Sequence, residues 1–273
     1  MRLGVVLAEP FAEDAARVEA FGFDLAWVDE SSTPAPLVTA AALAASTSSP
    51  RLAAAVTAGA HPILLAEEAA VADLSCHGRL VLVLASDEAA LLRETVELLF
   101  RAWAARPFRH DGPRWSVPAG LPEHENAELQ VRVTPAPEQL EPTVWLAGQA
   151  AVSVAAEFGL APVGESEATA TAFWTAAERD GGPAALRARR PHRLRVEADA
   201  QGRVEPAALI GRLRAERDAW GADVAILELP PGLTGAARER ALGRIATAVA
   251  PAIALDRVPR GLSEYWEGES ADA

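Results

Sequence analysis

Eight short apolar runs recur along this chain, and their spacing restricts its fold more than any other feature of the sequence. Several runs are apolar at successive positions, as expected for strands covered on both faces in a parallel sheet. The stretches between them carry apolar residues at helical spacing, for example Leu91, Leu98 and Leu99. Eight strand and helix units predict an α/β fold, a closed (β/α)8 TIM barrel. The predicted strands comprise residues 3–7, 25–28, 52–57, 80–85, 144–147, 161–163, 194–198 and 224–227.

The barrel is expected to form a single domain over residues 1–261, since such barrels use about 250 residues. The interval from 106 to 142 breaks the repeated pattern because it is rich in proline and polar residues. We therefore expect an irregular excursion there, with a turn at Asp111 and Gly112. The polar, acidic residues 262–273 predict a flexible C-terminal tail.

Charge and cysteine content exclude several classes of protein. The formal net charge of −13 repels nucleic acid and anionic membrane surfaces. Cys76 is the only cysteine, so the chain forms no internal disulfide and no multi-thiolate metal site. No apolar run reaches the roughly 18 residues of a membrane span, and the first run is too short for a signal peptide. We expect a cytoplasmic protein without nucleic-acid, membrane or metal binding.

Three segments carry the pattern of a known family. One of them contains His61-Pro62 after a predicted strand, then a helix rich in alanine and glutamate, then Gly78-Arg79-Leu80 before the next strand. In these segments the chain resembles the luciferase-like monooxygenase family, which comprises bacterial luciferase-like flavin and deazaflavin oxidoreductases. The resemblance is that of a divergent member. The segments are residues 21–28, 53–84 and 142–148.

The resemblance implies FMN or a deazaflavin coenzyme at the C-terminal mouth of the barrel, together with a small-molecule substrate. Ala55, Val56 and Thr57 end the third predicted strand, where the family places residues beside the cofactor ring. Gly148 and Gln149 follow the fifth predicted strand and are expected to present free backbone amides to the phosphate. An ordinary strand-to-helix turn is the alternative at Gly148.

Glu30 and His61 are the candidate catalytic residues. Many family members carry a histidine after the acidic residue of the second strand, but here Ser31 follows Glu30. Serine does not titrate near neutral pH, so a histidine-dependent step is absent or has moved. His61 is the best remaining proton donor or substrate contact, with packing of its loop as the alternative. Glu9, Asp29 and Glu30 could also form a carboxylate pair or bind a cation, although three oxygen ligands without a further histidine give little support for a metal site.

Two departures from the family predict that cofactor binding is weak or absent. Residues 84–88 lead almost directly into a helix, with Ser86 or Asp87 as its N-cap, so the usual lid over the site is missing. The rim of the mouth is acidic, which disfavours a phosphate unless an arginine from a nearby loop reaches it. The arginines considered for this role are Arg109, Arg114 and Arg203.

Two functions follow from these features. The first is an oxidoreductase or monooxygenase of the luciferase-like type. The second is a non-catalytic barrel that has lost the cofactor and acts as a partner subunit or small-molecule binder. In either case we expect a homodimer, because residues 40–45 and 66–72 form small-residue helix surfaces that allow close approach, and luciferase-like proteins commonly pair there.

Overall fold

Eight parallel strands form a barrel in the computed structural model, which describes residues 1–118, 129–164, 167–176 and 190–255. The hydrogen-bonded order is β8-β7-β4-β3-β2-β1-β10-β9. Gly164 closes the ring, because its N–H donates to Pro191 O (2.8 Å) and its carbonyl accepts from Arg193 N (2.9 Å). The predicted barrel is confirmed. The strands are β1 (Arg2–Val6), β2 (Leu25–Asp29), β3 (Arg51–Thr57), β4 (Leu80–Ala85), β7 (Thr143–Ala147), β8 (Ala161–Pro162), β9 (Pro191–Arg195) and β10 (Val224–Glu228).

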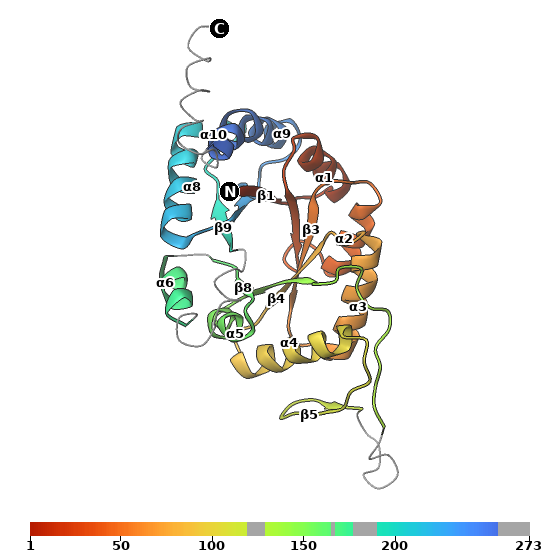
Figure 1. The fold of residues 1–273 in the computed structure, drawn as a ribbon. Helices are drawn as coiled ribbons and strands as arrows, with labels where there is room; N and C mark the ends of the chain where they lie inside the picture. The colour runs from red at the N-terminus through yellow and green to blue at the C-terminus, as the bar shows by residue number, and fades with distance from the viewer. Residues whose placement is uncertain (119–128, 165–166, 177–189, 256–273) are drawn as a thin grey trace.

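Helices surround the strands, as Figure 1 shows. An apolar layer between strands and helices forms the larger core, and a second, smaller core fills the inside of the barrel around Trp27 and Trp145. Within the described ranges, no helix is long and apolar enough to cross a bilayer. The helices are α1 (Phe11–Ala20), α2 (Pro36–Ala44), α3 (Pro62–Ser75), α4 (Ala89–Trp103), α5 (Ala151–Phe158), α6 (Glu167–Ala176), α8 (Pro206–Trp220), α9 (Gly235–Arg244), the π-helix η2 (Ile245–Val249) and α10 (Ala250–Leu255).

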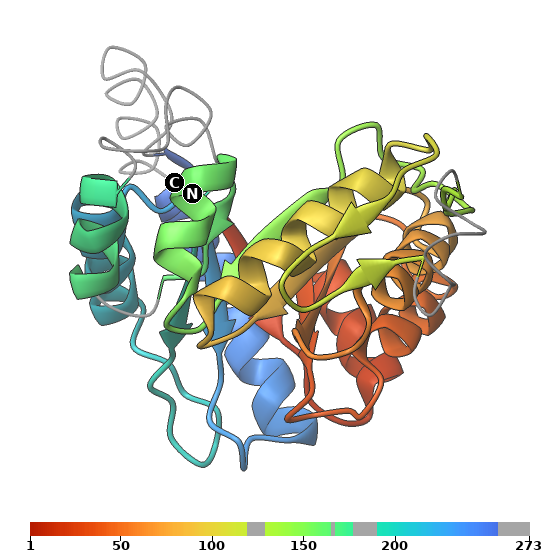
Figure 2. The same ribbon diagram turned by 90° about the horizontal axis from the view of Figure 1, so that it is seen from below.

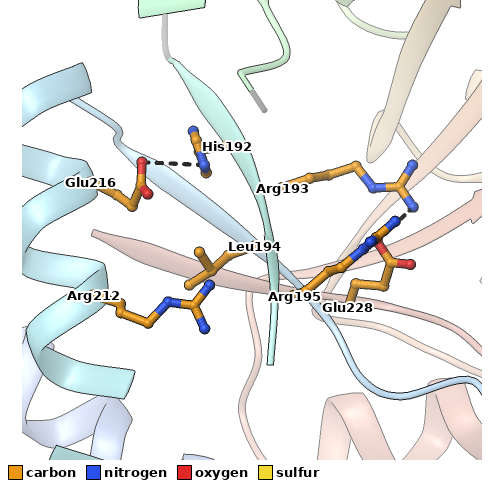
Figure 3. A pocket seen from close by; sticks show the side chains of 7 residues that line it. All are labelled: His192, Arg193, Leu194, Arg195, Arg212, Glu216 and Glu228. Atoms are coloured by element: carbon orange, nitrogen blue, oxygen red, sulfur yellow. Dashed lines mark hydrogen bonds and ion pairs between the residues drawn. The ribbon is translucent and has the colours of Figure 1, made fainter. Parts of the chain in front are cut away.

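One strand differs in position from its prediction. Residues 194–198 were expected to form the seventh strand, because Leu194 and Val196 are apolar, but β9 begins three residues earlier. Its side chains alternate: Leu194 faces α8, while Arg193 and Arg195 lie on the other side of the strand (Figure 3). Charged inward-facing residues escape a search for apolar runs, and they are tolerated here because they lie at the open end of the barrel.

The excursion after α4 contains a short antiparallel hairpin of β5 (His110–Asp111) and β6 (Ser116–Val117). The buried Glu94 of α4 holds it, because its carboxylate lies 3.0 Å from His110 Nε2 and accepts from Trp115 N (3.0 Å). Figure 2 shows the hairpin alongside α4. The remainder of the expected excursion at 119–128 and the expected tail at 262–273 lie outside the described residues.

A buried ion pair fixes the loops around β1. Arg238 Nε and Nη2 donate to the two carboxylate oxygens of Asp14 at 2.7 and 2.6 Å, and both side chains are at most 4% exposed. The same carboxylate accepts from Ala8 N (3.0 Å), and Arg238 Nη2 also donates to Val6 O (2.6 Å). This network joins α1 and α9 to the end of β1, and so positions one part of the barrel mouth.

Candidate functional site

The inward-facing residues at the C-terminal strand ends divide the mouth of the barrel into two halves. On β3, β4 and β7, the register aligns Thr57 with Ala85 and Ala85 with Ala147. This small-residue half, defined by Thr57, Ala85 and Ala147, is open to solvent at Thr57 and partly open at the two alanines. Ala55 lies one layer deeper, level with Asp29. Short side chains leave space for a flat, largely apolar ligand.

The opposite half, formed by β2, β9 and β10, is charged. Arg193 Nη1 lies 3.5 Å from Asp29 Oδ2, and its Nη2 lies 3.2 Å from Glu228 Oε2. The Arg193 guanidinium also lies 5.5 Å from the centre of the Trp27 ring, within the range of a cation–π contact. A cavity of about 440 Å³ runs along β9 and includes Arg193, Arg195 and Glu228 in its lining (Figure 3). We call Asp29, Arg193 and Glu228 the charged half.

Asp29 is held as a carboxylate by its neighbours. It accepts hydrogen bonds from Ser31 Oγ (2.5 Å), Ser32 Oγ (3.2 Å) and Trp27 Nε1 (3.2 Å). Burial raises the pKa of Asp29, but these bonds and the charge of Arg193 outweigh burial, so the pKa lies below its ordinary value. Asp29 therefore stays ionised near neutral pH and orients Arg193.

Glu30 and Thr57, two residues predicted for the site, contact each other directly. The N–H and the hydroxyl of Thr57 donate to the Glu30 carboxylate at 3.0 and 2.6 Å. The contact joins the loop after β2 to the end of β3. Val56, predicted beside the cofactor ring, faces outward and lines a groove between α2 and α3 instead. Of the three predicted residues on this strand, Ala55 and Thr57 face the mouth.

His61 lies at the beginning of α3 and serves as its N-cap. Its Nδ1 accepts a hydrogen bond from Ile63 N (3.3 Å), and its ring packs edge-on against Trp115 with the centroids 4.9 Å apart. The neutral ring therefore carries its proton on Nε2. Among the described residues, no hydrogen bond or ion pair connects His61 with Glu30. The structure thus gives the two candidate catalytic residues separate partners.

Gly148 and Gln149 do lie together at the beginning of α5, but their backbone amides are not all free as predicted. Gln149 N donates to Asp87 Oδ1 (2.9 Å), and Ala150 N lies 3.3 Å from Ser86 O. Gly148 has a φ of +88°, and a Cβ there would lie 2.5 Å from Ser86 O. Only glycine allows the two loops to approach this closely without strain.

The connection between β4 and α4 is short, because only Ser86, Asp87 and Glu88 separate them. The predicted N-cap is wrong: Glu88 occupies that position, and Ser86 Oγ accepts from Glu88 N (3.0 Å). Asp87 is thereby left to reach Gln149 on the neighbouring loop. Tertiary proximity has overridden the local capping preference.

The three arginines proposed for the rim each bind an acidic residue, and one of them, Arg114, does so in the connection after β4. Arg109 pairs with Asp111, Arg203 with Asp199, and Arg114 with Glu88. Among the described residues, Arg193 does enter the mouth, and it was not predicted there because β9 was expected to begin at residue 194. Arginine at alternate positions, Arg193 and Arg195, is the signal that marks the inward face of this strand.

Three acidic residues of the rim each contact a different neighbour. Asp29 faces Arg193, Glu30 faces Thr57, and Asp87 faces Gln149. In the part of the chain that the structure describes, no three His, Cys, Asp or Glu side chains group together as metal ligands. Glu165, also on the predicted rim, lies outside the described residues.

Fold and site together define a (β/α)8 barrel whose mouth, at the C-terminal strand ends, has a small-residue half and a charged half. Comparison with known families is specific: the model of the luciferase-like monooxygenases matches residues 8–196. The chain belongs to the luciferase-like monooxygenase family. No curated protein matches significantly.

Solved structures share the fold at low sequence identity. Monooxygenase RslO1 from Streptomyces bottropensis is 17% identical with a TM-score of 0.73, covering 93% of this chain and 100% of that one. The oxygenating constituent of 3,6-diketocamphane monooxygenase from Pseudomonas putida, in complex with FMN, is 16% identical with a TM-score of 0.67, covering 92% and 98%. Coenzyme F420-dependent tetrahydromethanopterin reductase from Methanopyrus kandleri is 12% identical with a TM-score of 0.65, also covering 92% and 98%.

Proposed function

We propose that this protein is a flavin- or deazaflavin-dependent oxidoreductase that acts on a small molecule at the mouth of its barrel. Membership of the luciferase-like monooxygenase family is the observation that carries the proposal. Two of the similar structures are described with FMN or coenzyme F420, which supports a cofactor of this type. The small-residue half offers the matching surface for a flat ring.

The two ends of a flavin meet different conditions here. The ring fits the small-residue half, where Thr57, Ala85 and Ala147 present little bulk. The phosphate does not fit the beginning of α5, because the Asp87 carboxylate accepts the Gln149 amide proton that a phosphate would need. The connection after β4 consists only of Ser86, Asp87 and Glu88, which is too short to cover the mouth. A missing phosphate contact and a missing cover each cost about 1–3 kcal/mol, and each 1.4 kcal/mol is about tenfold in affinity.

The residues beside the ring surface have distinct tasks under this proposal. A bound flavin supplies the electron transfer. Glu30 holds the end of β3 through Thr57 and offers a carboxylate at the rim to accept a proton. His61 offers Nε2 as a proton donor, since its Nδ1 is committed to Ile63. Arg193, held between Asp29 and Glu228, presents guanidinium N–H donors at the charged half.

The non-catalytic alternative rests on the same charges. Arg193 is already satisfied by two carboxylates, and Asp87 already fills the amide site before α5. A mouth whose polar groups pair internally requires no cofactor for stability. Under this alternative the barrel serves as a partner subunit or small-molecule binder.

Titration of the purified protein with FMN, reduced FMN and a deazaflavin, followed by fluorescence, separates the two functions. We expect the protein to purify without colour and to bind flavin with a Kd in the micromolar range or weaker. Ala147→Phe fills the small-residue half and should abolish binding, whereas Ala90→Phe on the exposed face of α4 should not change it. Absence of binding to the unmodified protein would favour the non-catalytic barrel, and tight stoichiometric flavin as isolated would contradict weak binding.

We also propose that the protein acts as a cytoplasmic homodimer through α2 and α3. The alanines expected to form its surface are mostly buried in the core, among them Ala40, Ala66 and Ala70, so larger apolar side chains support the proposal. A groove of about 740 Å³ lies between these helices, and it is lined largely by apolar residues. Val38, Leu64 and Val71 around it are 69%, 50% and 52% exposed, which is unusual for large apolar side chains that face only water. Light scattering should give twice the mass of the chain, and Leu64→Glu should halve it. A monomer mass at micromolar concentrations would contradict this.

A further inference from the structure

We propose that Asp87 makes the site selective for flavins without a terminal phosphate, of the riboflavin type. The inference rests on the proposed flavin site and specifies its ligand. It follows from one contact: a carboxylate of the chain itself occupies the backbone amide at which the phosphate of FMN would be held. Asp87 is thus a specificity-determining residue.

The backbone amides of Gln149, Ala150 and Ala151 all have partners within the chain. Asp87 Oδ1 accepts from Gln149 N at 2.9 Å, and Ser86 O lies 3.3 Å from Ala150 N. Ala151 N donates to Gly148 O (3.2 Å) within the turn itself. Three successive amides therefore have partners inside the chain. A phosphate would have to displace the carboxylate before it could bind there.

The negative charge of Asp87 also disfavours a phosphate at this position. Asp87 is exposed and follows the C-terminal end of β4, so its charge lies at the mouth of the barrel. Among the described residues, no arginine or histidine forms an ion pair with it, and its carboxylate accepts a hydrogen bond only from Gln149. A phosphate close to an uncompensated carboxylate is repelled. The ring surface on β3, β4 and β7 does not include Asp87, so an uncharged flavin avoids this penalty.

The short connection after β4 explains why the carboxylate is held in place. Ser86 Oγ caps Glu88 N, which releases Asp87 from the role of N-cap. Gly148, with its positive φ, allows Ser86 O to lie against the next loop. The two loops are therefore joined through the backbone of Ser86, which donates to Ala147 O and accepts from Ala150 N, and the Asp87 carboxylate lies beside them against Gln149 N.

Titration with riboflavin and with FMN, followed by fluorescence, tests the inference directly. The unmodified protein should bind riboflavin at least tenfold more tightly than FMN. Asp87→Ala and Asp87→Asn should tighten FMN binding about tenfold or more and change riboflavin binding less than threefold. Glu205→Gln, which removes an exposed carboxylate at the beginning of α8, should change neither by more than threefold. Equal affinities for the two flavins, or equal effects of Asp87→Ala on both, would overturn the inference.

A second measurement does not depend on flavin. In the unmodified protein, inorganic phosphate should leave the NMR signal of the Gln149 amide unchanged, and in Asp87→Ala it should shift that signal in a saturable manner. Saturable shifts in the unmodified protein, or none in the Asp87→Ala protein, would overturn the assignment. If no variant binds flavin while phosphate behaves as expected, the proposed function fails and the occupation of the amide site by Asp87 stands.

Discussion

Arg193 lies over the ring of Trp27 inside the barrel, with its guanidinium carbon 5.5 Å from the ring centre. The arginine comes from β9 and the tryptophan from β2, strands that are not neighbours in the sheet. Asp29 and Glu228 fix the guanidinium from two further directions. An arginine in this position connects three strands across the mouth, and its removal has consequences for stability and for pH dependence.

Arg193→Met should destabilise the protein by about 1–3 kcal/mol, because it leaves the buried Asp29 carboxylate without its counterion and Glu228 with only the distant Arg195. The matched control is Arg195→Met on the same face of β9. Arg195 is 88% exposed and lies 4.0 Å from Glu228, so its loss should change the free energy of unfolding by less than about 1 kcal/mol. Urea unfolding measures both. Equal destabilisation by the two substitutions would show that Arg193 acts as a surface charge.

The lowered pKa of Asp29 predicts a loss of stability in acid. Since its pKa is lower in the folded than in the unfolded protein, its contribution is fully present above the unfolded value of about 4. The contribution is lost as pH falls through the folded pKa. Asp29→Asn should therefore be less stable near pH 7 and lose less stability between pH 5 and 3. A slope in this range that matches the unmodified protein would contradict the assignment.

Gly148→Ala should destabilise the protein by about 1–3 kcal/mol, because φ is +88° and the new Cβ would overlap Ser86 O. Gly59→Ala is the control, since a Cβ there meets nothing within 4 Å. Thermal unfolding measures both. The larger Gly148→Glu should also abolish flavin binding, and retention of binding by that variant would separate the loop from the ligand site.

The Cys76 thiol should be inert in the folded protein. It is completely buried, and burial raises its pKa to about 11, so little thiolate exists at pH 8. Alkylation should be slow until urea is added, when the thiol should react at the rate of a free cysteine. Cys76→Ser should leave flavin binding unchanged. Rapid alkylation of the folded protein would show that reagent reaches the Cys76 thiol, which would contradict its burial.

Arg238→Met should cost about 3–5 kcal/mol, because Asp14 would remain buried without its partner. Arg17→Met is a useful comparison, since its ion pairs with Glu13 and Glu239 lie at the surface. Chemical unfolding of both variants gives the difference directly. Similar small effects would mean that water reaches the Asp14 carboxylate when Arg238 is removed.

The barrel and its family were determined by local patterns. Apolar runs of strand length, alternating with helical spacing, predict the fold because each element must cover one apolar surface with its neighbours. The segment from residue 53 to 84 carried the resemblance for the same reason, since a strand, a helix and the next strand follow one another in sequence. Even the position of Gly148 in a tight loop follows from its place after a predicted strand.

The contacts that characterise the site were decided only by tertiary structure. Arg193 and Asp29 are 164 positions apart, and Asp87 and Gln149 are 62 apart. Which side chains meet at the mouth depends on the register of every strand around the closed ring. A one-residue change in register sends a side chain to the opposite face of the sheet. Local spacing therefore could not show that Arg193 faces the mouth, nor that the amides at the beginning of α5 have partners on a neighbouring loop. Closure of the barrel brought Arg193 to Asp29, and the close approach of two loops brought Asp87 to Gln149.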